Sequence, residues 1–172
     1  MNRRGILGIF AIAASGLFLL TGNAVSQGKK INPKQLIGHW TLVSADTTHP
    51  DGSHVQSFGS SPKGVAVFEP NGLFSVSLVN SDLPKFTSNN RDTGNADENK
   101  AVVQGSLFYF GTYSVSASDG TLGLEIEGSS FPNWTHVNQK RMITSLTANE
   151  VKWVNPVAST GGTAELAWKR VK

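Results

Sequence analysis

The chain of 172 residues contains no cysteine, and only 16 % of its residues are charged. Without cysteine it can form neither a disulfide nor a thiolate metal site. A lipid-modified N-terminus is also excluded, because no cysteine follows the apolar N-terminal run. The charged fraction is below the usual value of about 25 %. Because hydrophobic residues make up 38 % of the chain, a packed core is expected and a disordered chain is excluded. The length suits one domain.

The N-terminal segment has the layout of an export signal. Two arginines precede an apolar run from residue 5 to residue 20, and small residues follow it. We predict a signal peptide over residues 1–26, cleaved after Ala24 or Ser26, and one domain over residues 27–172. The alternative is a membrane anchor, but a spanning helix needs roughly 20 apolar residues. We therefore expect no stable membrane anchor after cleavage and a periplasmic or secreted location.

Charge and motif searches exclude several classes of function. Loss of Arg3 and Arg4 with the signal leaves 13 basic residues against 12 acidic ones. A nucleic-acid binder needs a concentrated basic face, so no nucleic-acid partner is predicted. The four histidines show no ligand spacing, and no metal site is predicted. Because the chain has neither a nucleophile elbow nor a phosphate-binding glycine loop, we predict no cofactor and assign no catalytic residue.

Alternating hydrophobic and polar residues predict a series of short β-strands. In the first, Trp40 and Leu42 share one face. Asn71-Gly72 and Asp119-Gly120 are typical of tight hairpin turns. A short helical turn is expected at Asn32-Pro33, before the first strand. The predicted strands cover residues 38–45, 65–69, 73–79, 107–116, 121–127, 140–147, 151–156 and 163–171.

Short antiparallel strands joined mostly by tight turns predict an all-β fold, a closed antiparallel up-and-down barrel of about eight strands. Such a barrel either fills its interior with side chains or holds one small ligand, and the sequence leaves both possibilities open. The connection over residues 81–106 is long and polar, with a brief helix expected over residues 96–103. We expect it to lie over one mouth of the barrel, with Phe86 and Arg91 at the rim.

Motifs at the two ends of this domain resemble the lipocalin arrangement. Gly38-His39-Trp40 opens the first strand, and Arg170 lies near the end of the last one. In a closed barrel the guanidinium of Arg170 would lie over the ring of Trp40, a cation–π contact that caps one end. Further segments contribute, and together they resemble the lipocalin-like domain family of bacterial and fungal proteins. These segments cover residues 36–44, 58–72, 109–113, 128–134 and 139–141.

The resemblance implies a small exported barrel in a family whose members mostly have no assigned activity. Some more distant lipocalin-like barrels bind apolar metabolites, and others accelerate the cyclisation or isomerisation of such molecules. The family pattern has a histidine near the position of Glu125, where this chain has a carboxylate. The resemblance therefore transfers no role of that histidine to this chain.

The candidate ligand contacts are aromatic residues and one arginine. Tyr109 and Tyr113 share a face, and a buried hydroxyl needs a partner, which is a ligand oxygen, a backbone carbonyl or a water. Arg141 would bind an anionic head group if it points inward and is a surface charge if it points outward. Phe131 and Trp134 resemble aromatic residues at the rim of a pocket, whereas Trp134 is alternatively a plug. The candidate ligand-binding residues are Phe74, Tyr109, Tyr113, Phe131, Trp134 and Arg141, and the barrel-closing residues are Gly38, Trp40 and Arg170.

Three functions follow from these observations. The leading hypothesis is an exported module that binds a small hydrophobic or amphipathic molecule in its barrel. The second is a cofactor-independent isomerase or cyclase that uses a tyrosine hydroxyl as proton donor. The third is a packed barrel that acts through protein contacts, for which exposed Phe108 and Phe110 would form an apolar patch. The sequence favours binding over catalysis and does not predict an oligomeric state.

Overall fold

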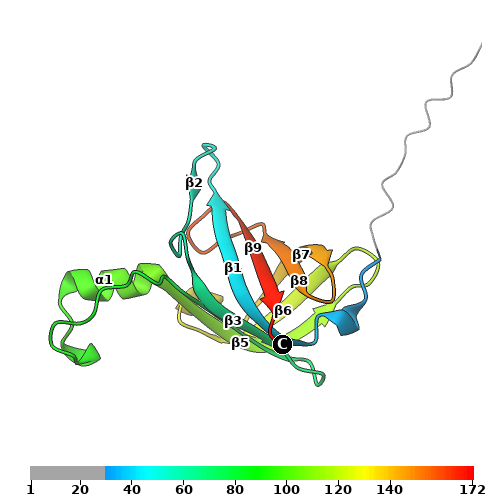
Figure 1. Cartoon of the computed structure of the whole chain (residues 1–172), viewed down its shortest axis with the longest axis horizontal. Helices are drawn as coiled ribbons and strands as arrows, with labels where there is room; N and C mark the ends of the chain where they lie inside the picture. Colours follow the sequence, from blue (N-terminus) through cyan, green and yellow to red (C-terminus); the bar gives the residue numbers. More distant parts are fainter. Residues whose placement is uncertain (1–29) are drawn as a thin grey trace, which may run out of the picture.

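The barrel is closed by pairing between its first and last strands. The structure is a computed structural model that describes residues 30–172, so the predicted signal peptide over residues 1–26 lies outside the described residues. Within residues 30–172, nine strands form one antiparallel sheet in the order β2-β1-β3-β4-β5-β6-β7-β8-β9, and β1 also pairs with β9 (Figure 1). The strands β1 and β3–β9 therefore form an eight-stranded barrel, which confirms the predicted fold class.

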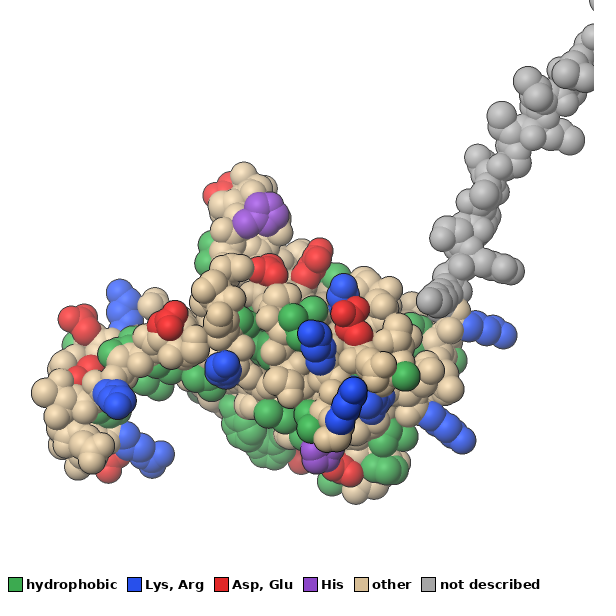
Figure 2. Space-filling view, in the orientation of Figure 1, with side chains coloured by type: hydrophobic (Ala, Val, Ile, Leu, Met, Phe, Trp, Pro, Cys, Tyr) green, Lys and Arg blue, Asp and Glu red, His purple; other side chains and the backbone are tan. Residues whose placement is uncertain are grey.

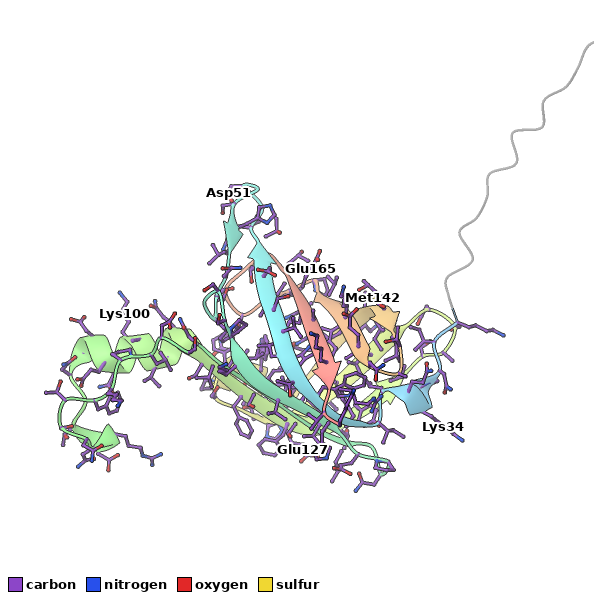
Figure 3. The ribbon with its side chains drawn as sticks, in the orientation of Figure 1. Lys34, Asp51, Lys100, Glu127, Met142 and Glu165 are labelled. Atoms are coloured by element: carbon purple, nitrogen blue, oxygen red, sulfur yellow. The ribbon has the colours of Figure 1, made fainter. Side chains whose placement is uncertain are left out.

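The eight predicted strands are present, β4 with the predicted bounds and the others with shifted ends. β2, which was not predicted, pairs only with the end of β1 and forms a ribbon that carries Asp51 at its tip (Figure 3). The strands are β1 (Gly38–Thr48), β2 (His54–Val55), β3 (Lys63–Phe68), β4 (Leu73–Val79), β5 (Ser106–Val115), β6 (Thr121–Ser129), β7 (Val137–Leu146), β8 (Glu150–Asn155) and β9 (Thr163–Arg170). The helical segments are η1 (Pro33–Gln35), η2 (Arg91–Thr93), α1 (Ala96–Gly105) and η3 (Pro132–Trp134).

Aromatic side chains fill the interior of the barrel at the end where β1 begins and β9 ends. Trp153 and Trp168 are buried and stack with their ring centroids 5.0 Å apart, and Phe68 packs edge-on against Trp153. Phe68 of β3, Trp153 of β8 and Trp168 of β9 each lie on the buried face of their strand, where side chains alternate between buried and more exposed positions. The indole N–H groups of both tryptophans are buried, and neither has a hydrogen-bond partner among the described residues. This end of the barrel is a packed core.

Arg170 ties three parts of the chain together at this closed end. Its guanidinium carbon lies 4.1 Å from the centroid of the Trp40 ring, so the structure contains the expected cation–π contact. The same side chain donates hydrogen bonds to the carbonyl oxygens of Ala148 at 2.5 Å, Ile37 at 2.8 Å and Gln35. One cation therefore satisfies carbonyls from the N-terminal turn and from the β7–β8 turn.

Gly38 leaves the space that this arrangement requires. A Cβ at this position would lie 2.7 Å from Nη1 of Arg170, and the backbone φ of +125° is one that other residues rarely adopt. The indole of Trp40 in turn donates a 2.8 Å hydrogen bond to the carbonyl of Leu36, which anchors η1 beneath the barrel. The spacing of glycine and tryptophan in the first strand thus has a direct structural cause.

The long connection forms an arm, defined as residues 81–105, that projects away from the barrel (Figure 1). The helix expected within it is present as α1, but the expected position over the mouth is wrong. The side chain of Arg91 is 91 % exposed and Phe86 packs against Gly94 inside the arm, so neither residue reaches the rim. The buried residues of α1 are Glu98 and Gly105, and without an apolar face the helix has nothing to bury against the barrel.

Glu98 holds the arm in shape. Its carboxylate accepts hydrogen bonds from the backbone N–H and the hydroxyl of Thr87, at 2.9 and 2.8 Å, and from the backbone N–H of Asn95 at 2.9 Å. In return, the side-chain oxygen of Asn95 accepts a hydrogen bond from the backbone N–H of Glu98, which completes a capping box at the start of α1. The backbone hydrogen bonds from Thr87 and Asn95, followed by the Thr87 hydroxyl, lower the pKa of Glu98.

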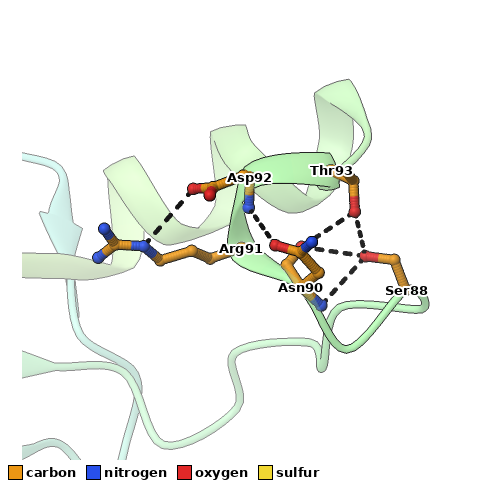
Figure 4. A network of polar contacts seen from close by, with 5 residues as sticks. All are labelled: Ser88, Asn90, Arg91, Asp92 and Thr93. Atoms are coloured by element: carbon orange, nitrogen blue, oxygen red, sulfur yellow. Dashed lines mark hydrogen bonds and ion pairs between the residues drawn. The ribbon is translucent and has the colours of Figure 1, made fainter.

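The tip of the arm contains a second, exposed network (Figure 4). The hydroxyl of Thr93 donates to that of Ser88 at 2.9 Å, and the amide oxygen of Asn90 caps η2. Arg91 and Asp92 form a 3.7 Å ion pair in which both side chains are exposed, so this pair contributes little stability. Local polar contacts define the shape of the tip.

Candidate functional site

A small chamber lies inside the end of the barrel opposite Arg170. Its volume is about 40 Å³, and the residues around it include Phe58, Leu107, Tyr109, Trp134, Arg141 and Asn155. That volume holds only a few water molecules. A pocket for a small-molecule ligand is usually about 300 Å³ or larger. The interior is therefore largely filled by side chains, with one polar chamber near the mouth.

An aromatic cluster closes this chamber. The ring of Tyr109 meets Trp134 edge-on with centroids 5.4 Å apart, and Phe131 packs edge-on against Trp134 at 5.9 Å. Trp134 is 8 % exposed and is the last residue of η3, a short turn that Pro132 begins. Since the turn directs the indole back under the mouth, Trp134 separates the chamber from solvent.

Arg141 points into the barrel. It pairs across the sheet with Leu122, whose side chain is fully buried, and Arg141 itself is only 2 % exposed. Its guanidinium donates to the carbonyl of Lys140 at 2.9 Å and to Oε1 of Gln139 at 2.6 Å. The guanidinium carbon lies 5.5 Å from the Trp134 ring centroid. The inward orientation left open by the sequence is the one observed.

The charge of Arg141 has no counter-ion. Within residues 30–172 the ion pairs closer than 4.0 Å are Arg91–Asp92 and Lys152–Glu150, and neither involves Arg141. The first 29 residues contain no Asp or Glu that could serve. A buried cation without an anion is costly, because protein groups replace the lost hydration only in part. Arg141 is therefore a buried cation that lacks an anionic partner among the described residues.

Tyr109 contributes a proton donor beside this cation. Burial raises the pKa of the Tyr109 phenol, and the nearby charge of Arg141 opposes this effect without reversing it. The phenol is consequently protonated at neutral pH and can donate to an anion next to Arg141. The side chain is 2 % exposed, so bulk water has little access to it.

The barrel wall is split beside Arg141. Residues 137–142 of β7 pair with β6, whereas the registered pairing of β7 with β8 extends only from Met142 opposite Val154 to Leu146 opposite Val151. The two strands therefore are not paired on the N-terminal side of Met142, along residues 137–141 of β7. Within the described chain, residues 137–141 have a neighbouring strand on one side only.

This split opens into a cleft of about 420 Å³, which is in the range of small-molecule pockets. Val137, Gln139, Pro156 and Val157 contribute to its walls. Three residues border both this cleft and the chamber inside the barrel, namely Trp134, Arg141 and Asn155. The cation thus stands between a small polar interior and a larger, mixed cleft.

The candidate residues from the sequence fall into three groups. Tyr109, Phe131, Trp134 and Arg141 lie together at the mouth. Phe74 packs against Tyr109 one layer deeper, at a centroid distance of 5.9 Å. Their role in ligand binding stays a prediction.

Tyr113 lies apart from the mouth cluster. Its hydroxyl donates to the carbonyl of Glu69 at 3.0 Å, and its ring packs edge-on against Phe68 near the closed end. The backbone carbonyl considered as an alternative partner is therefore the observed one. Tyr113 belongs to the packed end of the barrel.

Sequence reasoning missed Asn155 and Gln139. Asn155 is 5 % exposed and shares an inward face with Val151 and Trp153, so the period of two in β8 was the signal that could have placed it inside. Gln139 is two residues from Arg141 on β7, but that strand was predicted to begin at residue 140. The late predicted start removed Gln139 from consideration.

The outer surface carries a separate apolar groove of about 700 Å³. Phe108 and Phe110 of β5 are 47 % and 40 % exposed, and Leu73 of β4 and Val67 of β3 also line the groove. Figure 2 shows hydrophobic side chains gathered on this lower side of the barrel. The charged residues of the groove, Glu69 and Glu127, are exposed. Because it contains no buried charged or polar group, the groove has the character of a contact surface.

Residues 30–172 contain neither a cluster of metal-ligating side chains nor a membrane-spanning helix. In this part of the chain no three His, Cys, Asp or Glu side chains gather as a metal ion would require. None of the helices found there is long and apolar enough to cross a membrane.

An eight-stranded antiparallel barrel, with a Trp–Arg contact at one end and a cluster of aromatic side chains at the other, defines a lipocalin-like protein. The model of the lipocalin-like domain family matches residues 37–171, and the chain belongs to this family. No curated protein matches the chain. Among solved structures, a redesigned β-barrel matches 81 % of this chain and 94 % of its own, with 15 % identity and a TM-score of 0.42.

Proposed function

We propose that this protein binds a small hydrophobic or amphipathic molecule at the open end of its barrel. The observation that carries this function is the position of Trp134, which borders both the inner chamber and the 420 Å³ cleft. A molecule in the cleft would contact the indole, Val137 and Val157 and would reach the polar groups of the chamber behind them. This combination of apolar walls and a few convergent polar groups is typical of small-molecule sites.

Two exposed valines provide a matched test. Val157 lines the cleft and is 74 % exposed, whereas Val103 on the arm is 77 % exposed and far from it. Neither side chain contributes to the core, so Val157→Glu and Val103→Glu are both expected to fold. We expect the fluorescent apolar probe N-phenyl-1-naphthylamine to bind the wild type and Val103→Glu alike and to bind Val157→Glu at least tenfold more weakly.

The same titration distinguishes the cleft from the outer groove. If the probe binds Val157→Glu normally and loses affinity for Phe110→Ser, the binding surface is the groove and the proposed site is wrong. Native mass spectrometry of the protein from an exporting host gives an independent result. We expect an additional mass of a few hundred daltons, and its release by Val157→Glu would place that molecule in the cleft.

A further inference from the structure

Arg141 is a buried cation whose charge no described acidic side chain neutralises. The closed end shows how this protein employs a structural arginine, since Arg170 bonds three backbone carbonyls and lies 4.1 Å from its ring. Arg141 makes one backbone bond and one bond to the half-buried Gln139, and it lies farther from its ring, at 5.5 Å from the centroid of Trp134. Its burial is nevertheless almost complete, at 2 % exposure. A ligand that brings an anion would supply the partner missing from the protein.

We propose that the ligand of this site is an amphipathic monocarboxylate, with its carboxylate bound by Arg141 and Tyr109 and its apolar tail in the cleft between β7 and β8. This rests on the function proposed above and adds the chemical class of the ligand. A guanidinium offers planar paired donors that match the two oxygens of a carboxylate. The phenol of Tyr109 adds a neutral donor from β5, which is separated from β7 by β6.

The size of the chamber favours a small head group. About 40 Å³ accommodates a carboxylate with few waters, and a bulky head group such as a sugar would not fit without movement of Trp134. The buried charge at the mouth is a single cation, which one monovalent anion neutralises. Asn155, also buried and at the boundary of chamber and cleft, can donate an amide hydrogen bond to the same group.

The split in the wall provides the place for the tail. Because β7 and β8 are not paired on the N-terminal side of Met142, the alkyl tail of a ligand can lie there without breaking hydrogen bonds of the sheet. Val137, Pro156 and Val157 supply apolar contacts along this route. The ligand therefore enters through the side of the barrel, and the filled interior below Tyr109 stays packed.

Decanoate and 1-decanol test the head group, because they share a tail and differ in charge. Displacement of N-phenyl-1-naphthylamine is measured for both at pH 7.5. We expect decanoate to bind the wild type at least about tenfold more tightly than 1-decanol, the advantage of a charge-assisted hydrogen bond pair. Arg141→Met should remove this preference, and Lys152→Met, which removes an exposed charge from the outer face of β8, should keep it.

A measurement on the wild type avoids dependence on the folding of Arg141→Met. In ¹³C NMR of decanoate labelled at its carboxyl carbon, the bound carboxylate should stay ionised to a lower pH than free monomeric decanoate, because Arg141 stabilises the anion. A bound signal that titrates at the pH of the free acid or above would overturn the assignment of Arg141 as its partner.

The outcomes separate this inference from the proposed function. Equal binding of decanoate and 1-decanol leaves the apolar site intact and overturns the carboxylate. Tighter binding of decyl phosphate than of decanoate replaces the carboxylate by a phosphoryl head group. A decanoate preference that survives Arg141→Met also overturns the inference. If neither compound displaces the probe from the wild type, the proposed function itself fails.

Discussion

The guanidinium of Arg170 lies 4.1 Å from the ring of Trp40 and joins the last strand of the barrel to the first. The contact works with three hydrogen bonds from Arg170 to backbone carbonyls at the closed end. These carbonyls belong to the N-terminal turn and the β7–β8 turn, so Arg170 connects segments that are distant in sequence. It is the principal polar link of the packed end.

Replacing Arg170 by alanine is expected to destabilise the barrel. Loss of the cation–π contact and of hydrogen bonds from a charged donor should lower the free energy of unfolding by about 2–4 kcal/mol. The melting temperature should fall by roughly 5–10 °C. Lys169→Ala, one residue away and exposed, should change it by about 0.5 kcal/mol or less. Equal shifts in the two variants, measured by thermal and urea denaturation, would contradict the role of Arg170.

Arg141→Met should have the opposite effect on the ligand-free protein. Methionine removes a buried charge that has no counter-ion and fills a similar volume, so the free energy of unfolding should stay unchanged or rise. Lys152→Met removes an exposed charge and should have little effect. A loss of more than about 1 kcal/mol in urea denaturation of Arg141→Met would assign the side chain a structural role instead.

The stability of the arm should depend on pH through Glu98. Its pKa is lowered in the folded arm by hydrogen bonds from Thr87 and Asn95, so the carboxylate stabilises the arm above the unfolded pKa of 4.5. That contribution is lost as the pH falls through the lower, folded pKa. Backbone amide exchange of Thr87 and Asn95, corrected for its intrinsic pH dependence, should therefore lose protection as the pH falls through this lowered pKa. Glu98→Gln should show weak protection at every pH, and a pH profile like that of the wild type would refute this explanation.

The outer groove should bind apolar dyes independently of the mouth. Phe108 and Phe110 are close to half exposed, and their rings lie 5.7 Å apart on the outer face of β5. The double variant Phe108→Ser with Phe110→Ser should reduce the fluorescence of bound anilinonaphthalene sulfonate and leave the melting temperature within a few degrees. Unchanged fluorescence would show that the dye binds elsewhere, and sedimentation velocity on both proteins would reveal any self-association through this face.

The period of two was sufficient to predict most of the barrel, because each strand buries one face. It could not place residues along the barrel axis. Tyr109 and Tyr113 share a face, but four residues of strand separate them by about 13 Å, and one lies at the mouth while the other lies near the closed end. The side of the strand on which a residue lies and its position along the barrel axis are independent, and only the strand register determines the position along the axis.

The direction of the arm and the split in the wall were beyond the sequence for a related reason. A polar segment with a good helix cap predicts α1 but contains no information about what it approaches. The split depends on where two strands stop pairing, and the pairing stops because β8 is short and ends at Asn155. Arg141 is present in the sequence, but its lack of a counter-ion is visible only in three dimensions.

The closed end has a practical consequence for handling the protein. Arg170 bonds the carbonyls of Gln35 and Ile37, and the backbone N–H of Val171 bonds the carbonyl of His39 at 2.9 Å, while Ile31 bonds the carbonyl of Ala117 in the β5–β6 turn, so both ends of the described segment leave the barrel on the side of the packed core. A sensor surface or affinity tag attached at either end would leave the cleft facing free solution.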